Sequence, residues 1–258
     1  MAKIYAIISG KGGVGKTTTT INLAASLNYL GEDVVIVDAN LTTPNVGIHL
    51  GAPIVPVTLN HVLSNQVKFE EAIYEHESGT KVMPASLSLR ETEKVDYKKF
   101  PDLMKKVKKI TNYVLIDCAA GLGEEARTAI DACDEIIIVT NPEMSAVTDA
   151  LKTIKLAEEK GKPITGVILT RYRGKSHEMS IPNIKDMLEI PILGIIPEDD
   201  AIRESQALKN AVIHTHPRSR AARTYFNISK RILGEDVEFV DPLKMGIIGR
   251  FLQGIGLK

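Results

Sequence analysis

Short apolar runs alternate along the chain with segments whose apolar residues recur at helical spacing. The apolar runs are nearly continuous and rich in β-branched residues, which is typical of strands buried on both faces of a parallel sheet. These predicted strands are Ile4–Ile8, Val34–Val37, Val82–Pro84, Tyr113–Ile116, Glu135–Thr140, Ile164–Thr170 and Ile192–Ile196. The helical candidates between them include Thr17–Leu30, Asp102–Ile110, Met144–Lys160 and Ile181–Leu188. The alternation predicts an α/β fold with a doubly wound, mostly parallel sheet of seven or eight strands.

The pattern changes near the end of the chain. No linker rich in Pro, Gly or Ser interrupts residues 1–233, so we expect them to form one domain. Residues 234–242 read GEDVEFVDP, an acidic and turn-like segment that we interpret as a linker. Residues 243–258 form a short apolar tail containing several glycines, which we treat as a separate functional piece.

Composition and charge limit the possible classes of protein. With 44% hydrophobic and 25% charged residues, the chain is an ordinary globular protein rather than a disordered one. Its 32 basic and 32 acidic residues cancel, unlike those of a protein whose whole surface binds nucleic acid. Two cysteines, Cys118 and Cys133, are too few and too distant for a zinc or iron–sulfur site. The sequence has no signal peptide and no run of 18 apolar residues, which predicts a cytoplasmic location.

A glycine-rich loop carries the clearest chemical signal. Gly10–Thr17 reads GKGGVGKT, a full match to G-x-x-x-x-G-K-[ST] between a predicted strand and a predicted helix. Consecutive backbone amides at such a helix start attract phosphate, while Lys16 bridges the terminal phosphates and the Thr17 hydroxyl holds Mg²⁺. The sequence therefore predicts a site for ATP or ADP with Mg²⁺. Its phosphate-binding residues would be Gly10, Lys11, Gly12, Gly13, Val14, Gly15, Lys16, Thr17 and Thr18.

A second lysine in the loop, Lys11, makes the motif more specific. With this residue the loop reads KGGVGKTT and resembles that of the MinD/ParA family of P-loop ATPases, which have a deviant phosphate loop. The resemblance covers most of residues 1–233 and implies ATP hydrolysis. It also implies an ATP-dependent homodimer in which Lys11 reaches the partner's nucleotide. There it would have a catalytic role beside Lys16, adding positive charge in trans as an arginine finger does.

The end of the second predicted strand resembles the first switch of that family. Asp38 is followed by ANLTTPN, close to the family pattern D-x-D-x-x-x-x-N, which implies a catalytic and metal-binding role for Asp38 and a nucleotide contact for Asn45. Asn40 replaces the usual aspartate that positions or activates the attacking water. An amide cannot accept a proton at neutral pH but can orient water, so we predict slow hydrolysis. The alternative is that position 40 tolerates either side chain.

Residues 115–121, LIDCAAG, resemble the second switch. The family pattern implies that Asp117, at a strand end, holds the magnesium shell and that the Gly121 amide approaches the γ-phosphate. The alternative interpretation of Asp117 is a helix N-cap.

Two further segments resemble the family and complete the expected site. Residues 139–149, VTNPEMSAVTD, are similar to the MinD branch in particular and imply a dimer interface. Its residues would be Asn141, Glu143, Ser145 and Asp149, with Asp149 holding Lys11 in the resting state. Two later strand ends would flank adenine through Thr170, Arg171 and Pro197, although the family often has asparagine at position 170.

The tail has the pattern of an amphipathic helix. Placed on a helical wheel, one arc is apolar, whereas glycines, Gln253 and Arg250 occupy the opposite side. The apolar arc contains Leu243, Met245, Ile247, Ile248, Phe251, Leu252 and Ile255. The tail resembles the membrane-targeting sequence of the MinD branch and predicts peripheral binding to an anionic membrane at the inner face of the cell membrane. The alternatives are a helix docked on the domain itself, on a sister subunit or on another protein.

A basic stretch within Ser205–Arg231 indicates either an ordinary solvated helix face or a competing function. Its cations are Lys209, Arg218, Arg220, Arg223, Lys230 and Arg231. Relatives of the ParA type bind DNA nonspecifically through late basic residues, so partition of DNA or positioning of flagella are alternatives.

The leading hypothesis is a MinD-like ATPase that recruits or positions an unidentified protein partner, for a division site or polar machinery. Iron–sulfur carriers of this superfamily need paired cysteines, and the chain has no C-x-x-C.

Overall fold

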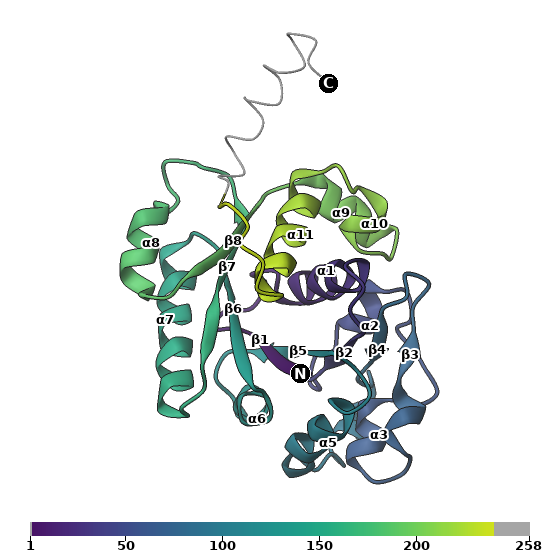
Figure 1. The fold of residues 1–258 in the computed structure, drawn as a ribbon. Helices are drawn as coiled ribbons and strands as arrows, with labels where there is room; N and C mark the ends of the chain where they lie inside the picture. Colours follow the sequence, from purple (N-terminus) through teal and green to yellow (C-terminus); the bar gives the residue numbers. More distant parts are fainter. Residues whose placement is uncertain (1, 240–258) are drawn as a thin grey trace.

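The computed structural model describes residues 2–239 and confirms the α/β fold (Figure 1). The strands are β1 (Lys3–Ser9), β2 (Val34–Asp38), β3 (Tyr74–Glu75), β4 (Lys81–Met83), β5 (Tyr113–Ala120), β6 (Glu135–Thr140), β7 (Ile164–Tyr172) and β8 (Ile192–Pro197). They form one eight-stranded sheet in the order β3-β4-β2-β5-β1-β6-β7-β8. Every neighbouring pair is parallel except β3 and β4, so the sheet is mostly parallel as predicted.

Helices cover both faces of the sheet because its central strands are apolar on both sides. Along β1, Ile4, Ala6 and Ile8 belong to one core cluster, whereas Tyr5 and Ile7 belong to the other. The first cluster is closed by α3 (Leu59–Leu63), α5 (Phe100–Val107), α6 (Glu124–Ala132), α7 (Met144–Glu159) and α8 (Ile181–Leu188). The second is closed by α1 (Lys16–Tyr29), α2 (Val46–His49), α9 (Asp200–Ala207), α10 (Val212–Thr215) and α11 (Arg220–Ile232). The remaining helices are α4 (Leu89–Thr92), η1 (Phe69–Ala72) and η2 (Tyr97–Lys99).

The parallel strands bring their carboxyl ends to one edge of the sheet. At this edge β1 runs into the glycine loop, and β2 ends at Asp38. Asp38 is paired in register with Asp117 of β5. The adjacent strands β1 and β5 connect to β2 and β6, which lie on opposite sides of them, so their carboxyl ends form a topological switch point, where α/β sheets commonly bind ligands.

The predicted boundaries differ from the observed ones by a few residues. Helix α5 begins at Phe100 rather than Asp102, because Pro101 sits in the first turn, where its missing amide hydrogen is tolerated. Strand β3 was not predicted, since two residues are too short to show a pattern.

The first half of the predicted linker packs against the domain. The Arg231 guanidinium donates hydrogen bonds of 2.8 to 3.2 Å to the carbonyls of Val237, Glu238 and Leu193. The Phe239 ring lies 5.6 Å from the Arg231 guanidinium carbon and 5.7 Å from Lys185 Nζ. The predicted amphipathic tail, residues 243–258, lies outside the described residues. Within residues 2–239, no helix is both long enough and apolar enough to span a bilayer.

Candidate nucleotide site

The glycine loop connects β1 directly to α1, as the motif requires. Gly15 caps α1 with a φ of 91°, a left-handed conformation that favours glycine. A side chain at Gly10 would overlap the Asp149 carbonyl of α7, so the loop packs closely against that helix. These two glycines therefore fix the course of the loop over the start of α1.

Asp117 connects the loop to the sheet. Its carboxylate is fully buried and accepts a 2.6 Å hydrogen bond from the Thr17 hydroxyl. Lys16 Nζ lies 3.4 Å from the same carboxylate, and the Thr20 hydroxyl lies 3.3 Å from it. The residues predicted to hold phosphate and metal thus meet at one point.

Asp38 lies beside this group in a different environment. It is also fully buried, but it accepts hydrogen bonds of 3.0 to 3.2 Å from the backbone amides of Asn40, Asn45 and Val46. Burial, followed by the neighbouring Asp117 charge, raises the pKa of Asp38 to about 7. Two adjacent carboxyl groups and the Thr17 hydroxyl form the oxygen-rich donor set that Mg²⁺ prefers. These residues fit the predicted magnesium site.

The Asn40 side chain is bound within its own turn. Its Nδ2 donates to the Thr43 carbonyl at 2.6 Å, and its Oδ1 accepts from the Thr43 hydroxyl at 3.0 Å and the Thr43 amide at 3.3 Å. Asn45 Nδ2 donates to the same carbonyl at 2.8 Å. The predicted water-orienting role of Asn40 therefore requires this turn to open.

A cleft of about 390 Å³ runs along the phosphate loop and continues into a second cavity of about 260 Å³. The two spaces share Gly15, Thr18, Arg171 and Gln206. Asn40, Asn45 and His49 line the first cleft. The cleft along the phosphate loop therefore opens into a second compartment that a bound nucleotide could enter.

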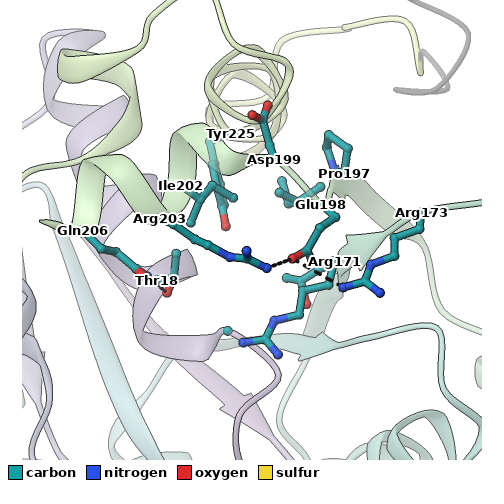
Figure 2. Close-up of a pocket in the computed structure, with 13 residues that line it drawn as sticks. Thr18, Arg171, Arg173, Pro197, Glu198, Asp199, Ile202, Arg203, Gln206 and Tyr225 are labelled. Atoms are coloured by element: carbon teal, nitrogen blue, oxygen red, sulfur yellow. Dashed lines mark hydrogen bonds and ion pairs between the residues drawn. The ribbon is translucent and has the colours of Figure 1, made fainter.

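The second cavity contains the residues predicted to flank adenine (Figure 2). Thr170, Arg171 and Pro197 all line it. The Thr170 hydroxyl, however, donates to the carbonyls of Val14 and Thr140, so it joins the loop to β6 instead of offering a free group to a base. These hydrogen bonds to the backbone weaken the prediction that Thr170 recognises adenine through its hydroxyl.

The sequence analysis missed several polar residues around this cavity. Glu198 lies 2.7 Å from an Arg203 nitrogen and 3.6 Å from an Arg173 nitrogen, and Gln206 donates to the Thr18 hydroxyl at 2.8 Å (Figure 2). His49, in the phosphate cleft, contacts the Asn45 carbonyl through Nδ1 at 2.8 Å. Its position one helical turn after Asn45 is the only signal that could have identified it.

Lys11 does not contact the residue predicted to hold it. Its Nζ donates to Glu143 at 3.0 Å and to the Ser145 hydroxyl at 3.1 Å, at the start of α7, whereas Asp149 pairs with Lys152 at 3.1 Å. The expectation that Asp149 holds Lys11 is wrong for this conformation. Lys11 instead reaches the start of α7, and its hydrogen bond lowers the pKa of Glu143. Asn141, at the end of β6, is buried.

The Gly121 amide also has a different partner from the one expected. It donates to the Ser9 carbonyl at 3.0 Å, with a φ of 83° at Gly121. A contact between this amide and a γ-phosphate would require that hydrogen bond to break.

A phosphate loop that leads from a buried strand into a helix, on a mostly parallel sheet, defines the class of P-loop NTPases, and this chain is one. The ParA family model described as "NUBPL iron-transfer P-loop NTPase" matches residues 1–233. The chain belongs to the ParA family.

Its relatives include septum site-determining MinD proteins. The Bacillus subtilis MinD is 31% identical over an alignment of 276 positions that covers all of both chains. The Pyrococcus horikoshii MinD, solved with Mg-ADP, has a TM-score of 0.86 and 35% identity, covering 90% of this chain and 96% of that one. The Aquifex aeolicus MinD in a MinC:MinD complex has a TM-score of 0.84 and 28% identity, covering 93% and 99%. The chain is a MinD-like ATPase of the ParA family, as the sequence resemblance predicted.

The cysteines give no support to an iron-transfer role of the kind that the family description names. Cys118 and Cys133 are both buried, and burial raises the pKa of both thiols. Buried, protonated thiols at separate positions are poor ligands for a transferable metal.

Proposed function

We propose that this ATPase forms a homodimer on Mg-ATP, binds the inner face of the cell membrane through its C-terminal tail and leaves the membrane after hydrolysis. The direction of the Lys11 side chain is the observation that supports a dimer. Its side chain is 40% exposed and extends from the phosphate loop to the first turn of α7, away from the Lys16–Asp117 group. A lysine in this position is free to exchange Glu143 for the phosphates of a second copy.

Within one protomer, the described residues suit the steps of nucleotide binding. The loop amides and Lys16 would hold the phosphates, and Thr17, Asp38 and Asp117 would hold Mg²⁺. The metal would neutralise the charge that develops on the transferred phosphoryl group. In the dimer, Lys11 of each copy would add positive charge to the partner's nucleotide. Hydrolysis would be slow, because Asn40 cannot act as a base and its amide is bound within the turn.

The membrane proposal rests on the apolar arc of residues 243–258. Seven large apolar side chains gain roughly 1.5–3 kcal/mol each on full burial, but an interfacial helix buries only one side of them. Ordering each residue costs about 1–2 kcal/mol, so one tail binds weakly. Two tails on one dimer can raise the avidity by about 10²–10⁴, which would couple attachment to ATP.

Co-sedimentation with anionic liposomes tests the proposal. We expect the full chain to pellet with Mg-ATP and to stay in the supernatant with Mg-ADP. A chain ending at Pro242 should fail to pellet in both states. Lys11→Ala should prevent both ATP-dependent dimerisation and pelleting, whereas Lys106→Ala, which removes an exposed lysine on α5, should change neither. Pelleting that is independent of the nucleotide would contradict the switch.

DNA binding remains the alternative outcome of the same experiment. Of the six basic residues in the predicted patch, Lys230 pairs with Glu235 at 2.9 Å, and Arg231 donates hydrogen bonds to backbone carbonyls. The four others are exposed: Lys209, Arg218, Arg220 and Arg223. If no pelleting occurs, salt-dependent DNA binding through these four residues becomes the hypothesis to test.

A protein partner completes the proposal. The MinD of Aquifex aeolicus was solved in a complex with MinC. That complex supports the proposal that the present chain also binds a protein partner. The cellular process would be the positioning of a division site or of polar machinery.

A further inference from the structure

A hydrogen-bond network joins the first switch to the helix that follows the second switch. The Thr42 hydroxyl donates to Glu125 Oε1 at 2.5 Å, and the Tyr97 hydroxyl donates to the same oxygen at 3.1 Å. Thr42 belongs to the first switch, Glu125 to the first turn of α6 and Tyr97 to η2. We call the hydrogen-bonded pair of Thr42 and Glu125 the switch latch. No motif identified any of the three residues.

The switch latch lies next to the bound amide of Asn40. Asn40 Oδ1 already accepts from the Thr43 amide and hydroxyl, so both of its lone pairs are in use. Its Nδ2 donates to the Thr43 carbonyl. Because Thr42 lies between these two residues in the chain, its bond to Glu125 holds the turn that binds Asn40.

A cavity of about 530 Å³ borders this network. Asn40, Thr42, Thr43, Tyr97 and Glu125 all line it. Asn40 and Thr43 also line the phosphate cleft, so they form a wall between the two spaces. A change at Glu125 can therefore reach the phosphate cleft through this wall.

We propose that Glu125 is a positioning residue that, through Thr42, restrains the first switch in a conformation in which Asn40 cannot orient water. The inference rests on the proposed ATPase function and adds a restraint on hydrolysis within the same site. Opening the turn frees Asn40 Oδ1 to accept a hydrogen bond from water. Breaking the Thr42–Glu125 bond should therefore speed hydrolysis without changing how the nucleotide binds.

The expected effect is moderate. A hydrogen bond to a carboxylate is stronger than one between neutral groups, but Thr42 is exposed, so water replaces part of it. We expect kcat to rise about two- to fivefold in Thr42→Val and in Glu125→Ala, with KM unchanged. Thr42→Ser and Glu125→Gln keep a donor and an acceptor, so their kcat should stay near the wild-type value.

Two further variants separate the restraint from a general loss of structure. The double variant Thr42→Val/Glu125→Ala should be no faster than the faster single variant, because both changes break one bond. Tyr97→Phe is the matched control. It removes the other donor to the same Glu125 oxygen without touching the first switch, and it should leave kcat unchanged.

Hydrogen exchange on the ligand-free proteins gives a readout that does not depend on activity. Exchange over residues 40–46 should be faster in Thr42→Val and Glu125→Ala than in the wild type and Tyr97→Phe. Exchange that is unchanged in Thr42→Val and Glu125→Ala would contradict the proposed restraint. So would a kcat that is unchanged or lower in both variants. Either result would leave the proposed ATPase function standing. Absence of ATP hydrolysis in the wild-type dimer would overturn the proposed function, and the exchange result would still decide whether the restraint exists.

Discussion

The Cα atoms of Asp38 and Asp117 are paired in register across β2 and β5, so two fully buried carboxyl groups lie side by side. Their surroundings differ. Asp117 has Lys16 Nζ at 3.4 Å and the Thr17 hydroxyl at 2.6 Å, whereas the donors to Asp38 among residues 2–239 are backbone amides. A cation placed between them would relieve the repulsion that raises the pKa of Asp38.

This pair predicts how stability depends on pH in the absence of nucleotide. The pKa of Asp38 is raised from 3.8 to about 7 in the folded protein, so the folded state holds its proton more tightly than the unfolded chain does. The contribution of Asp38 to stability is therefore full below pH 4 and is lost as the pH rises towards 7, by up to about 1.4 kcal/mol per pH unit. Asp38→Asn should flatten this slope in urea unfolding between pH 5 and 8. An equally steep slope in the variant would contradict the assignment.

Removal of Lys16 should abolish nucleotide binding. In the wild type, Mg-ADP at about 100 times its Kd should stabilise the fold by about 2.7 kcal/mol. Lys16→Ala should lose this stabilisation, because the phosphates lose their main cation, and Lys106→Ala should keep it. Thermal unfolding with and without Mg-ADP measures the difference. Removing Mg²⁺ with a chelator should reduce the wild-type shift, since the two aspartates would then repel the phosphates.

Asn40→Asp should raise kcat by about tenfold or more, because an aspartate can accept a proton from the attacking water. The new carboxylate would also face the Thr43 carbonyl that Asn40 Nδ2 now contacts, which would open the turn. Asn40→Ala opens the turn but offers no group to orient water, so it should be no faster than the wild type. Steady-state phosphate release gives all three rates, and an unchanged rate in Asn40→Asp would show that position 40 does not limit hydrolysis.

Arg231 should protect the segment that follows α11. Arg231→Met removes the hydrogen bonds to Val237, Glu238 and Leu193 and the cation–π contact with Phe239. We expect faster proteolysis between residues 234 and 240 and a loss of about 1–2 kcal/mol of stability. Arg218→Met, an exposed arginine outside this contact, is the control. Equal cleavage in both variants would contradict the role of Arg231.

The parts of the site that a local pattern encodes could be predicted from the sequence. The strands were found because they are buried on both faces, and Lys16, Thr17 and Asp117 were placed because the motif fixes their positions at strand ends. The partner of Lys11 was not, because Glu143, Ser145 and Asp149 are polar residues close together in the sequence, and only the folded structure decides which of them the lysine contacts. Glu198, Arg203 and Gln206 reach the base cavity from β8 and α9 through the fold, without a motif.

The contact between Arg231 and Phe239 sets a geometric limit on the tail. Phe239 is held against the domain, and Leu243, where the predicted helix starts, is only four Cα steps further on. Even a fully extended chain carries Leu243 no more than about 14 Å from Phe239. In the proposed dimer, each membrane-binding tail would therefore begin near the side of the domain where Phe239 contacts Lys185 of α8 and Arg231 of α11, and a bilayer bound by both tails would face that side. The nucleotide state would then control the orientation of the whole particle on the membrane as well as its attachment.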